Sequence, residues 1–358
     1  MIEKLWEPTL SGDTAIEKLQ ASKGFDSYTA LHQWSIENPG EFWSRAWDDN
    51  SVIGSKGSIF YKEGADFISS EFFPQARLNV AENLLAKGKD SDIAVVSILE
   101  DGTRSEITWA DLRIKVAATA AAMRAEGVVA GDRVVAWVPN ITETIIYALG
   151  ALSIGAVVST ASPDFAPHAV EDRFGQVEPK LLLAADGYNY NGKYFDCTEK
   201  SLEIEKLLPT LKKTVRVSQF EAWIAPFIGA EAVFEQLPFD HPGFVLFSSG
   251  TTGKPKCITH SGAGVMLKAQ SEMLYQFNIN KGQKVFFFTT CGWMMWNWLT
   301  MALGRGATIV LFDGAPMAPT PTILFDIAQN EELDFFGVSA KFIDSANKEG
   351  LKPAKSHD

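Results

Sequence analysis

The 358 residues of this sequence are enough for about two domains of ordinary size. Hydrophobic residues make up 46% of the chain and charged residues 21%, so disordered, collagen-like and coiled-coil proteins are excluded. A net charge of −12 leaves no basic surface for a phosphate backbone, and we expect no nucleic-acid partner. The spacing of Cys197, Cys257 and Cys291 fits neither a metal site nor a disulfide framework, and the N-terminus has no signal-peptide core; both indicate a cytoplasmic (cytosolic) protein.

The first 75 residues show no regular alternation of strands and helices, but they are rich in tryptophan. Trp43 and Trp47 are four residues apart and would therefore share one face of a helix. We expect residues 1–75 to form an N-terminal extension that these aromatic side chains hold against the core.

A strand–helix alternation begins at Ile93. Residues 93–98 and 104–108 predict two strands of a hairpin around Asp101-Gly102. Thr108 then caps a helix that ends near Gly127. Further strands are predicted at 133–138, 156–159, 180–185, 244–248, 284–288, 308–312 and 334–338. Further helices are predicted from 142 and from 167, and at 262–277, 296–304, 320–330 and 340–349.

This alternation is typical of an α/β protein built from βαβ units with mostly parallel sheets. We expect two layered subdomains, at residues 76–210 and 211–358. Residues 144–163 and 285–304 each run for about twenty residues without charge, the length of a membrane-spanning helix. Glycines and hydroxyl side chains interrupt both runs, so we expect buried strand and helix pairs and no membrane span.

The strongest chemical signal is the glycine- and hydroxyl-rich segment 247–256, FSSGTTGKPK, directly after an apolar strand. Its backbone amides, hydroxyls and ammonium groups can all face one polyanion, which indicates phosphate binding; the alternative is a flexible linker. The spacing is not that of a Walker A loop. Residues 187–193 match that spacing more closely but have Tyr194 in place of Ser or Thr, so an ordinary surface loop is favoured there.

The segment SSGTTGKPK resembles the phosphate loop of the adenylate-forming superfamily, which includes acyl-CoA synthetases and luciferases. The continuation PKCITHS, with TTCGWMMWNW and VLFDGAP further on, resembles the acetoacetyl-CoA synthetases of that superfamily. The likeness runs through nearly the whole chain. It implies that the fold is part of the large N-terminal domain of an adenylate-forming enzyme.

The resemblance implies an AMP-forming acid–thiol ligase that uses ATP, Mg²⁺ and coenzyme A to convert acetoacetate to acetoacetyl-CoA in lipid and ketone-body metabolism. Acetoacetyl-adenylate would be the intermediate. Preorganised donors would stabilise the charge that develops on pyrophosphate, with Lys256 as the catalytic residue. The implied phosphate-binding residues are Ser248, Ser249, Gly250, Thr251, Thr252, Gly253, Lys254 and Lys256.

The resemblance also implies an acyl pocket and a coenzyme A contact. Trp293, Met294, Met295 and Trp296 follow Gly292 where related enzymes line the acyl pocket; the alternative from the residues alone is core packing. Lys193 stands where related enzymes carry a basic residue that meets a phosphate of coenzyme A, although Tyr190 replaces a second one. Cys257 and Cys291 are expected to be inert buried thiols.

Three readings of the function remain open at this point. The first is acetoacetate–CoA ligation; the second is ligation of another short acid such as acetate or propionate. The third is a truncated, non-catalytic paralogue that binds nucleotide. Enzymes of the resembled family are about twice as long as this chain, so we expect the 358 residues alone to be inactive.

Overall fold

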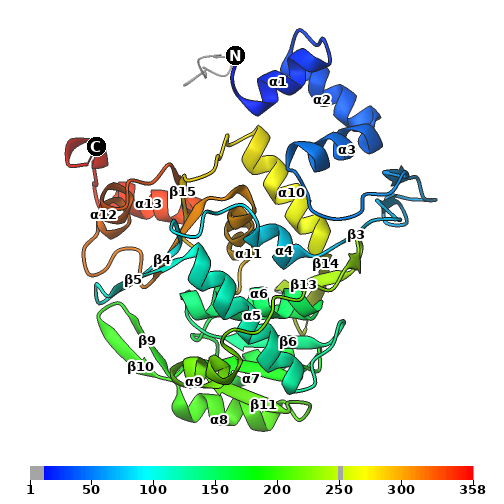
Figure 1. Ribbon diagram of the computed structural model, residues 1–358. Helices are drawn as coiled ribbons and strands as arrows, with labels where there is room; N and C mark the ends of the chain where they lie inside the picture. The colour runs from blue at the N-terminus through cyan, green and yellow to red at the C-terminus, as the bar shows by residue number, and fades with distance from the viewer. Residues whose placement is uncertain (1–11, 249–252, 358) are drawn as a thin grey trace.

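The computed structural model describes residues 12–248 and 253–357. Within this part of the chain, two twisted sheets dominate the architecture (Figure 1). The first sheet has six strands in the order β11-β8-β6-β7-β13-β14, and the second has five in the order β17-β15-β16-β4-β5. All neighbours run parallel except the edge strands β14 and β5, which pair antiparallel with β13 and β4. The expected mostly parallel α/β fold is confirmed.

The strands and helices have the following bounds. The strands are β1 (Tyr61–Lys62), β2 (Glu71–Phe72), β3 (Arg77–Leu78), β4 (Ile93–Leu99), β5 (Arg104–Thr108), β6 (Arg133–Trp137), β7 (Val157–Ala161), β8 (Leu181–Ala184), β9 (Gly187–Tyr190), β10 (Lys193–Asp196), β11 (Lys213–Arg216), β12 (Leu237–Pro238), β13 (Pro242–Ser248), β14 (Lys256–Ser261), β15 (Lys284–Phe287), β16 (Thr308–Asp313) and β17 (Phe335–Gly337). The α-helices are α1 (Ala15–Ser22), α2 (Tyr28–Glu37), α3 (Pro39–Asp49), α4 (Val80–Leu85), α5 (Trp109–Ala125), α6 (Thr142–Ile154), α7 (Pro167–Phe174), α8 (Thr198–Leu207), α9 (Phe220–Ile224), α10 (Gly262–Tyr275), α11 (Met294–Met301), α12 (Ile323–Asn330) and α13 (Ala340–Lys348).

The two sheets and their helices form five layers. Strand residues alternate between faces, so Val134 and Ala136 of β6 join the central core while Val135 and Trp137 join an outer one. The central core lies between the sheets and contains α5, α6, α10 and α11. Helices α7 and α8 cover the outer face of the six-stranded sheet, and α12 and α13 cover that of the five-stranded sheet. The central parallel strands of both sheets are therefore covered on both faces, as their apolar sequences predict, whereas the edge strands β5 and β14 are largely exposed.

Each sheet combines strands from both halves of the chain. The six-stranded sheet takes β13 and β14 from beyond residue 211, and the five-stranded sheet takes β4 and β5 from before residue 210. The sheets therefore do not coincide with the expected subdomains 76–210 and 211–358. Backbone pairing of β16 with β4 joins the two stretches, and the strand patterns could not reveal which strands pair.

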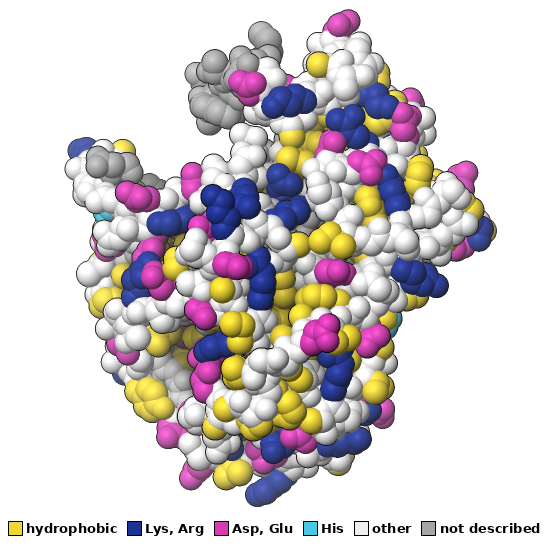
Figure 2. All heavy atoms as spheres, viewed as in Figure 1, with side chains coloured by type: hydrophobic (Ala, Val, Ile, Leu, Met, Phe, Trp, Pro, Cys, Tyr) yellow, Lys and Arg dark blue, Asp and Glu magenta, His cyan; other side chains and the backbone are white. Residues whose placement is uncertain are grey.

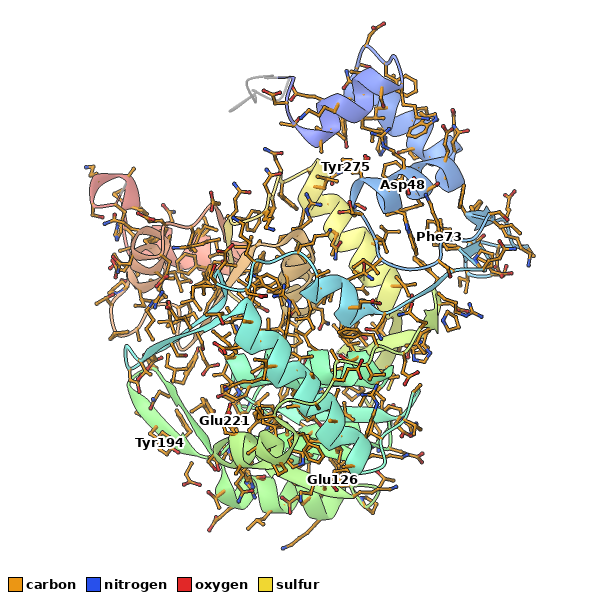
Figure 3. The ribbon with its side chains drawn as sticks, in the orientation of Figure 1. Asp48, Phe73, Glu126, Tyr194, Glu221 and Tyr275 are labelled. Atoms are coloured by element: carbon orange, nitrogen blue, oxygen red, sulfur yellow. The ribbon has the colours of Figure 1, made fainter. Side chains whose placement is uncertain are left out.

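The N-terminal helices are attached through aromatic packing. The ring of Trp47 on α3 lies 5.1 Å from Phe73 and 6.5 Å from Phe239, measured between centroids. Tyr275 at the end of α10 donates a hydrogen bond to Asp49 of α3 at 2.7 Å. Figure 3 shows Tyr275 and Asp48 at this junction of α10 and α3. The helix predicted for Trp43 and Trp47 is therefore present as α3.

The apolar runs 144–163 and 285–304 fold as expected. The first contains most of α6 and all of β7, and the second contains most of β15 together with α11. None of the helices among the described residues has the length and hydropathy needed to cross a membrane.

Candidate active site

Two cavities open where the carboxyl ends of the parallel strands of both sheets come together. One, of about 310 Å³, is lined by residues of β9 and by residues at or just after the ends of β7, β15 and β16, including Asp164, Tyr190 and Thr290. The other, of about 300 Å³, is lined by residues at or just after the ends of β4, β6, β8 and β11 and by residues of β9 and β10, including Tyr194 (labelled in Figure 3). Tyr188 and Asp313 line both. Ligands of open α/β sheets bind at such carboxyl ends.

Asp313, the last residue of β16, is the titratable group most affected by this position. Loss of hydration on burial, together with the nearby carboxylates Glu100 and Asp164, raises its pKa from 3.8 to about 6. The backbone N–H of Asn140 donates to Asp313 Oδ1 at 2.8 Å, which opposes the increase in pKa. The Asp313 carboxyl therefore keeps its proton to a higher pH than an exposed aspartate does.

Asn140 connects the two sheets beside these cavities. Its side chain is 2% exposed; Oδ1 accepts a hydrogen bond from Trp296 Nε1 at 3.0 Å, and Nδ2 donates to the Thr289 carbonyl at 3.3 Å. Asn140 follows β6, Thr289 follows β15, and Trp296 belongs to the first turns of α11. This one side chain therefore fixes the position of α11 relative to both sheets.

A buried carboxylate holds one wall of the cavities. Glu100 follows β4, is 7% exposed, and accepts hydrogen bonds from the backbone N–H groups of Asn191, Gly192 and Ala315 at 2.9, 2.6 and 2.6 Å. Asn191 and Gly192 have φ values of +52° and +73° and form the two-residue turn between β9 and β10. Segment 187–193 is therefore part of a hairpin with an Asn-Gly turn, and the expectation of an ordinary surface loop there is wrong.

The phosphate-loop segment connects β13 to β14, a strand that the sequence pattern did not predict. Ser248 and Lys256 are paired across the two strands, and Lys256 is exposed with no ion pair to any residue in 12–248 or 253–357. Lys254 Nζ lies 3.8 Å from Asp172 of α7, and Gln176 Nε2 donates to the Pro255 carbonyl at 2.9 Å. Gly253 has a φ of +158° and open space around its Cα. The predicted residues Ser249, Gly250, Thr251 and Thr252 lie outside the described residues.

The four residues predicted for the acyl pocket differ in their surroundings. Trp293 is 70% exposed, whereas Trp296 is 1% exposed and bonded to Asn140. Met294 and Met295 are partly buried and pack against the central core. Just before them, the Cys291 carbonyl accepts a hydrogen bond from Thr160 Oγ1 of β7 at 2.5 Å. The start of α11 therefore lies against the carboxyl end of β7, next to the strand that leads into the phosphate loop.

Lys193 and the cysteines lie at the edges of this arrangement. Lys193 is exposed on β10, opposite Tyr190, whose side chain lines a cavity. Cys291 is buried, and burial raises the pKa of its thiol well above the usual value. Cys257 is exposed on the edge strand β14, so the expectation that it is buried is wrong.

Sequence reasoning did not single out Glu100, Asn140 or Asp313 as site residues. Each follows or ends a predicted parallel strand, and that position was the available signal. Their roles depend on which strand ends meet, and the strand order decides this.

The AMP-binding enzyme family model matches residues 85–358, and the model of the acetyl-coenzyme A synthetase N-terminus matches residues 28–84. The chain belongs to the AMP-binding enzyme family. The matched segment contains β4 to β17 and therefore both cavities and the phosphate-loop segment.

The following relatives of this AMP-binding protein are all named acetoacetyl-CoA synthetase. Acetoacetyl-coenzyme A synthetase from Rhizobium meliloti is 44% identical over 94% of the chain and 54% of its own length. The chicken (Gallus gallus) acetoacetyl-CoA synthetase is 37% identical over 99% and 57%. The structure of acetoacetyl-CoA synthetase from Streptomyces lividans matches with a TM-score of 0.93 and 34% identity, over 99% of this chain and 58% of that one. The chain thus spans about half the length of these relatives.

Proposed function

We propose that this AMP-binding protein takes part in the ATP-dependent ligation of acetoacetate to coenzyme A. The supporting observation is the match of 94% of the chain, at 44% identity, to a protein named acetoacetyl-coenzyme A synthetase. Membership of the AMP-binding family supports ATP as the activating substrate. The chemistry would belong to lipid and ketone-body metabolism, and we place it in the cytosol on the spacing of the cysteines.

The proposed reaction has two steps, adenylation of the acid and transfer of the acyl group to coenzyme A. An acetoacetate carboxylate oxygen forms a bond to the α-phosphorus of ATP while the bond to the pyrophosphate oxygen breaks. The sulfur of coenzyme A then bonds to the acyl carbon, the bond to AMP breaks, and the thiol proton is released. Both steps place negative charge on a leaving phosphate group, so preorganised donors lower the barrier.

In this proposal the segment 248–256 holds the β- and γ-phosphates. Lys256 supplies a cation that no described carboxylate neutralises, whereas Lys254 is already close to Asp172. Ser248, Ser249, Gly250, Thr251, Thr252 and Gly253 would add hydroxyl and amide donors. No cluster of three or more acidic, histidine or cysteine side chains that could hold a metal occurs among the described residues. Mg²⁺ would bind through ATP phosphates and water together with at most one or two carboxylates, as this ion commonly does.

Coenzyme A and the acyl group would approach from different sides of α11. Tyr188, Tyr190 and Asp313 line a cavity beside the β9–β10 hairpin, and Lys193 on that hairpin would meet a phosphate of coenzyme A. Met294 and Met295, flanked by Trp293 and Trp296, would face the acyl chain. Unbranched thioethers suit a short keto-acyl chain because they supply apolar contact without charge.

A second acid has specific support. One relative, 35% identical over 89% of the chain, is named malonamoyl-CoA synthetase. Malonamate differs from acetoacetate by an amide NH₂ in place of the terminal methyl group. Apolar methionines favour the methyl group, so acetoacetate is the preferred acid. The comparisons give no comparable support to acetate, propionate or a non-catalytic paralogue.

A substrate panel on the complete gene product tests this proposal. Acetoacetate, malonamate, acetate and propionate are compared for acid-dependent pyrophosphate exchange and for acyl-CoA formation. We expect acetoacetate to give the highest kcat/KM, with malonamate lower by about 10- to 100-fold because its amide must lose hydration. A higher kcat/KM for any other acid would refute the assignment, and exchange with none of them would favour a binding protein.

Met294→Ala and Met295→Ala test the acyl pocket. Each should shift selectivity toward longer acids by about 10-fold or more, since a methylene in an apolar pocket is worth about 1 to 3 kcal/mol. A lower Tm with unchanged selectivity would instead assign both methionines to the core.

A further inference from the structure

A second group of charged residues lies at the opposite end of the five-stranded sheet from the cavities. Lys281 and Arg305 precede β15 and β16 in the chain, and Lys87 follows α4. A Cβ atom built on Gly306 would lie 3.1 Å from Lys281 Cγ and 3.3 Å from Lys87 Cβ, so both lysine stems flank the residue after Arg305. We call Lys87, Lys281 and Arg305 the basic cluster.

Two members of the basic cluster converge on one buried residue. Lys87 Nζ donates to the Asn50 carbonyl at 2.5 Å, and Arg305 Nη1 donates to Asn50 Oδ1 at 3.1 Å. Asn50 is 1% exposed. Arg305 Nε also donates to the Ile279 carbonyl at 3.2 Å. Neutral oxygens thus hold the two cations side by side.

The basic cluster lacks a counter-charge. Among residues 12–248 and 253–357, no carboxylate lies within the 4.0 Å ion-pair distance of Lys87, Lys281 or Arg305. Asp49, the residue before Asn50, is instead bound to Arg45 and Tyr275. Burial, together with the nearby charge of Arg305, lowers the pKa of Lys87 to about 8. Buried cations are usually paired, because an unpaired buried charge is costly.

We propose that the basic cluster is a binding site for an oxyanion of the phosphate class. Such an ion has several acceptor oxygens and can bridge an ammonium and a guanidinium group at once. Figure 2 shows Lys and Arg side chains gathered on this face between the end of α10 and the start of β15. The site lies at the amino ends of β15 and β16, whereas the cavities lie at the carboxyl ends, so it is separate from the proposed ATP and coenzyme A sites.

Titration with inorganic phosphate tests the proposal, using isothermal calorimetry and thermal unfolding against sodium chloride of equal ionic strength. We expect saturable binding, with Tm rising by about 2 °C or more at ten times the Kd. Lys281→Gln, an exposed change that leaves the core intact, should weaken binding by about fivefold or more, and Lys87→Met should abolish it. The Tm of each variant in chloride is measured beside the wild type, so that a loss of folding is not mistaken for a loss of phosphate binding.

Two controls separate this site from others. Lys341→Gln removes one exposed charge on α13 and should leave phosphate binding unchanged. Lys256→Ala should also leave it unchanged, so failure of the proposed ATP role and failure of this site are distinguishable. Equal Tm increases in phosphate and chloride, or wild-type binding by Lys281→Gln and Lys87→Met, would overturn the proposal.

Discussion

Lys256 allows the chemistry of the phosphate loop to be tested without disturbing the core. Its side chain is exposed at the start of β14, so Lys256→Ala should leave the Tm unchanged. Loss of one electrostatic donor should reduce acid-dependent pyrophosphate exchange in the complete gene product by about 10²- to 10³-fold. Lys254→Ala is the matched control and should cost less, because Asp172 already partly neutralises Lys254. Near-normal exchange by Lys256→Ala would remove this lysine from the mechanism.

The carboxyl of Asp313 makes stability depend on pH. Its pKa is about 6 in the folded protein against 3.8 as the ordinary value, so between these values the folded state binds more protons than the unfolded state. The cost of the buried charge is absent below pH 3.8, grows as pH rises, and is complete above about pH 6. It reaches about 2 to 3 kcal/mol in the free energy of unfolding.

Asp313→Asn should remove this cost while retaining an acceptor for the Asn140 N–H. Urea unfolding of both proteins from pH 4 to 8 measures the difference. We expect the Asn variant to gain stability relative to the wild type as pH rises to about 6, and the gain to remain constant above it. A difference that does not change with pH would mean that Asp313 titrates normally.

The β9–β10 hairpin depends on Glu100 for its attachment to the five-stranded sheet. Glu100→Ala removes the acceptor of three backbone amides, so the N–H groups of Asn191, Gly192 and Ala315 should exchange with solvent deuterium at least about tenfold faster. Glu100→Gln keeps one acceptor oxygen and should show a smaller effect. Unchanged exchange in Glu100→Ala would show that the turn needs no carboxylate.

The sequence pattern predicted the regular elements better than the irregular ones. Long apolar strands and capped helices, such as β4 and α5, have their own local signals and appeared where expected. The edge strand β14 (KCITHS) was missed because it is polar, exposed and follows a glycine-rich segment. The β9–β10 hairpin was not predicted, although Asn191-Gly192 is a strong turn signal. The spacing of Gly187, Gly192 and Lys193 is also close to that of a nucleotide-binding loop, and the two patterns cannot be told apart by glycine spacing alone.

Residues of the candidate site could be predicted only where they belong to a motif of neighbouring residues in the sequence. Lys256 and Met294 belong to motifs that can be read directly from neighbouring residues. Asn140 and Glu100 act through hydrogen bonds to segments more than 90 residues away, such as the bond from Gly192, 92 positions along the chain. No pattern in a single sequence encodes such partners, because they depend on strand order.

At the scale of the whole molecule, both sheets contain strands from before and after residue 210. We therefore expect that the chain cannot be divided at this point into two fragments that fold. Residues 1–210 alone would leave β4 without its partner β16, and residues 211–358 alone would leave β13 without β7. We expect both fragments to lack the near-ultraviolet circular dichroism of the intact chain and to aggregate, since each exposes strand edges and apolar faces. A chain cut in the polar loop around Asp66 is the control and should stay folded. Two fragments with native-like spectra would support independent subdomains.

Ser248 is paired with Lys256 across β13 and β14. Because of this pairing, the position of the lysine does not depend on the length of the loop before it. Strand pairing sets the height of Lys256 on the sheet and the face toward which it projects, whatever residues lie between the two strands. Insertions or deletions within 250–254 would therefore change the shape of the phosphate cradle and leave the ammonium group in place. One residue added inside β14 would instead turn Lys256 to the opposite face. Changes in loop length therefore act on the hydroxyl and amide donors alone, whereas a shift of β14 by a single residue removes the cation as well.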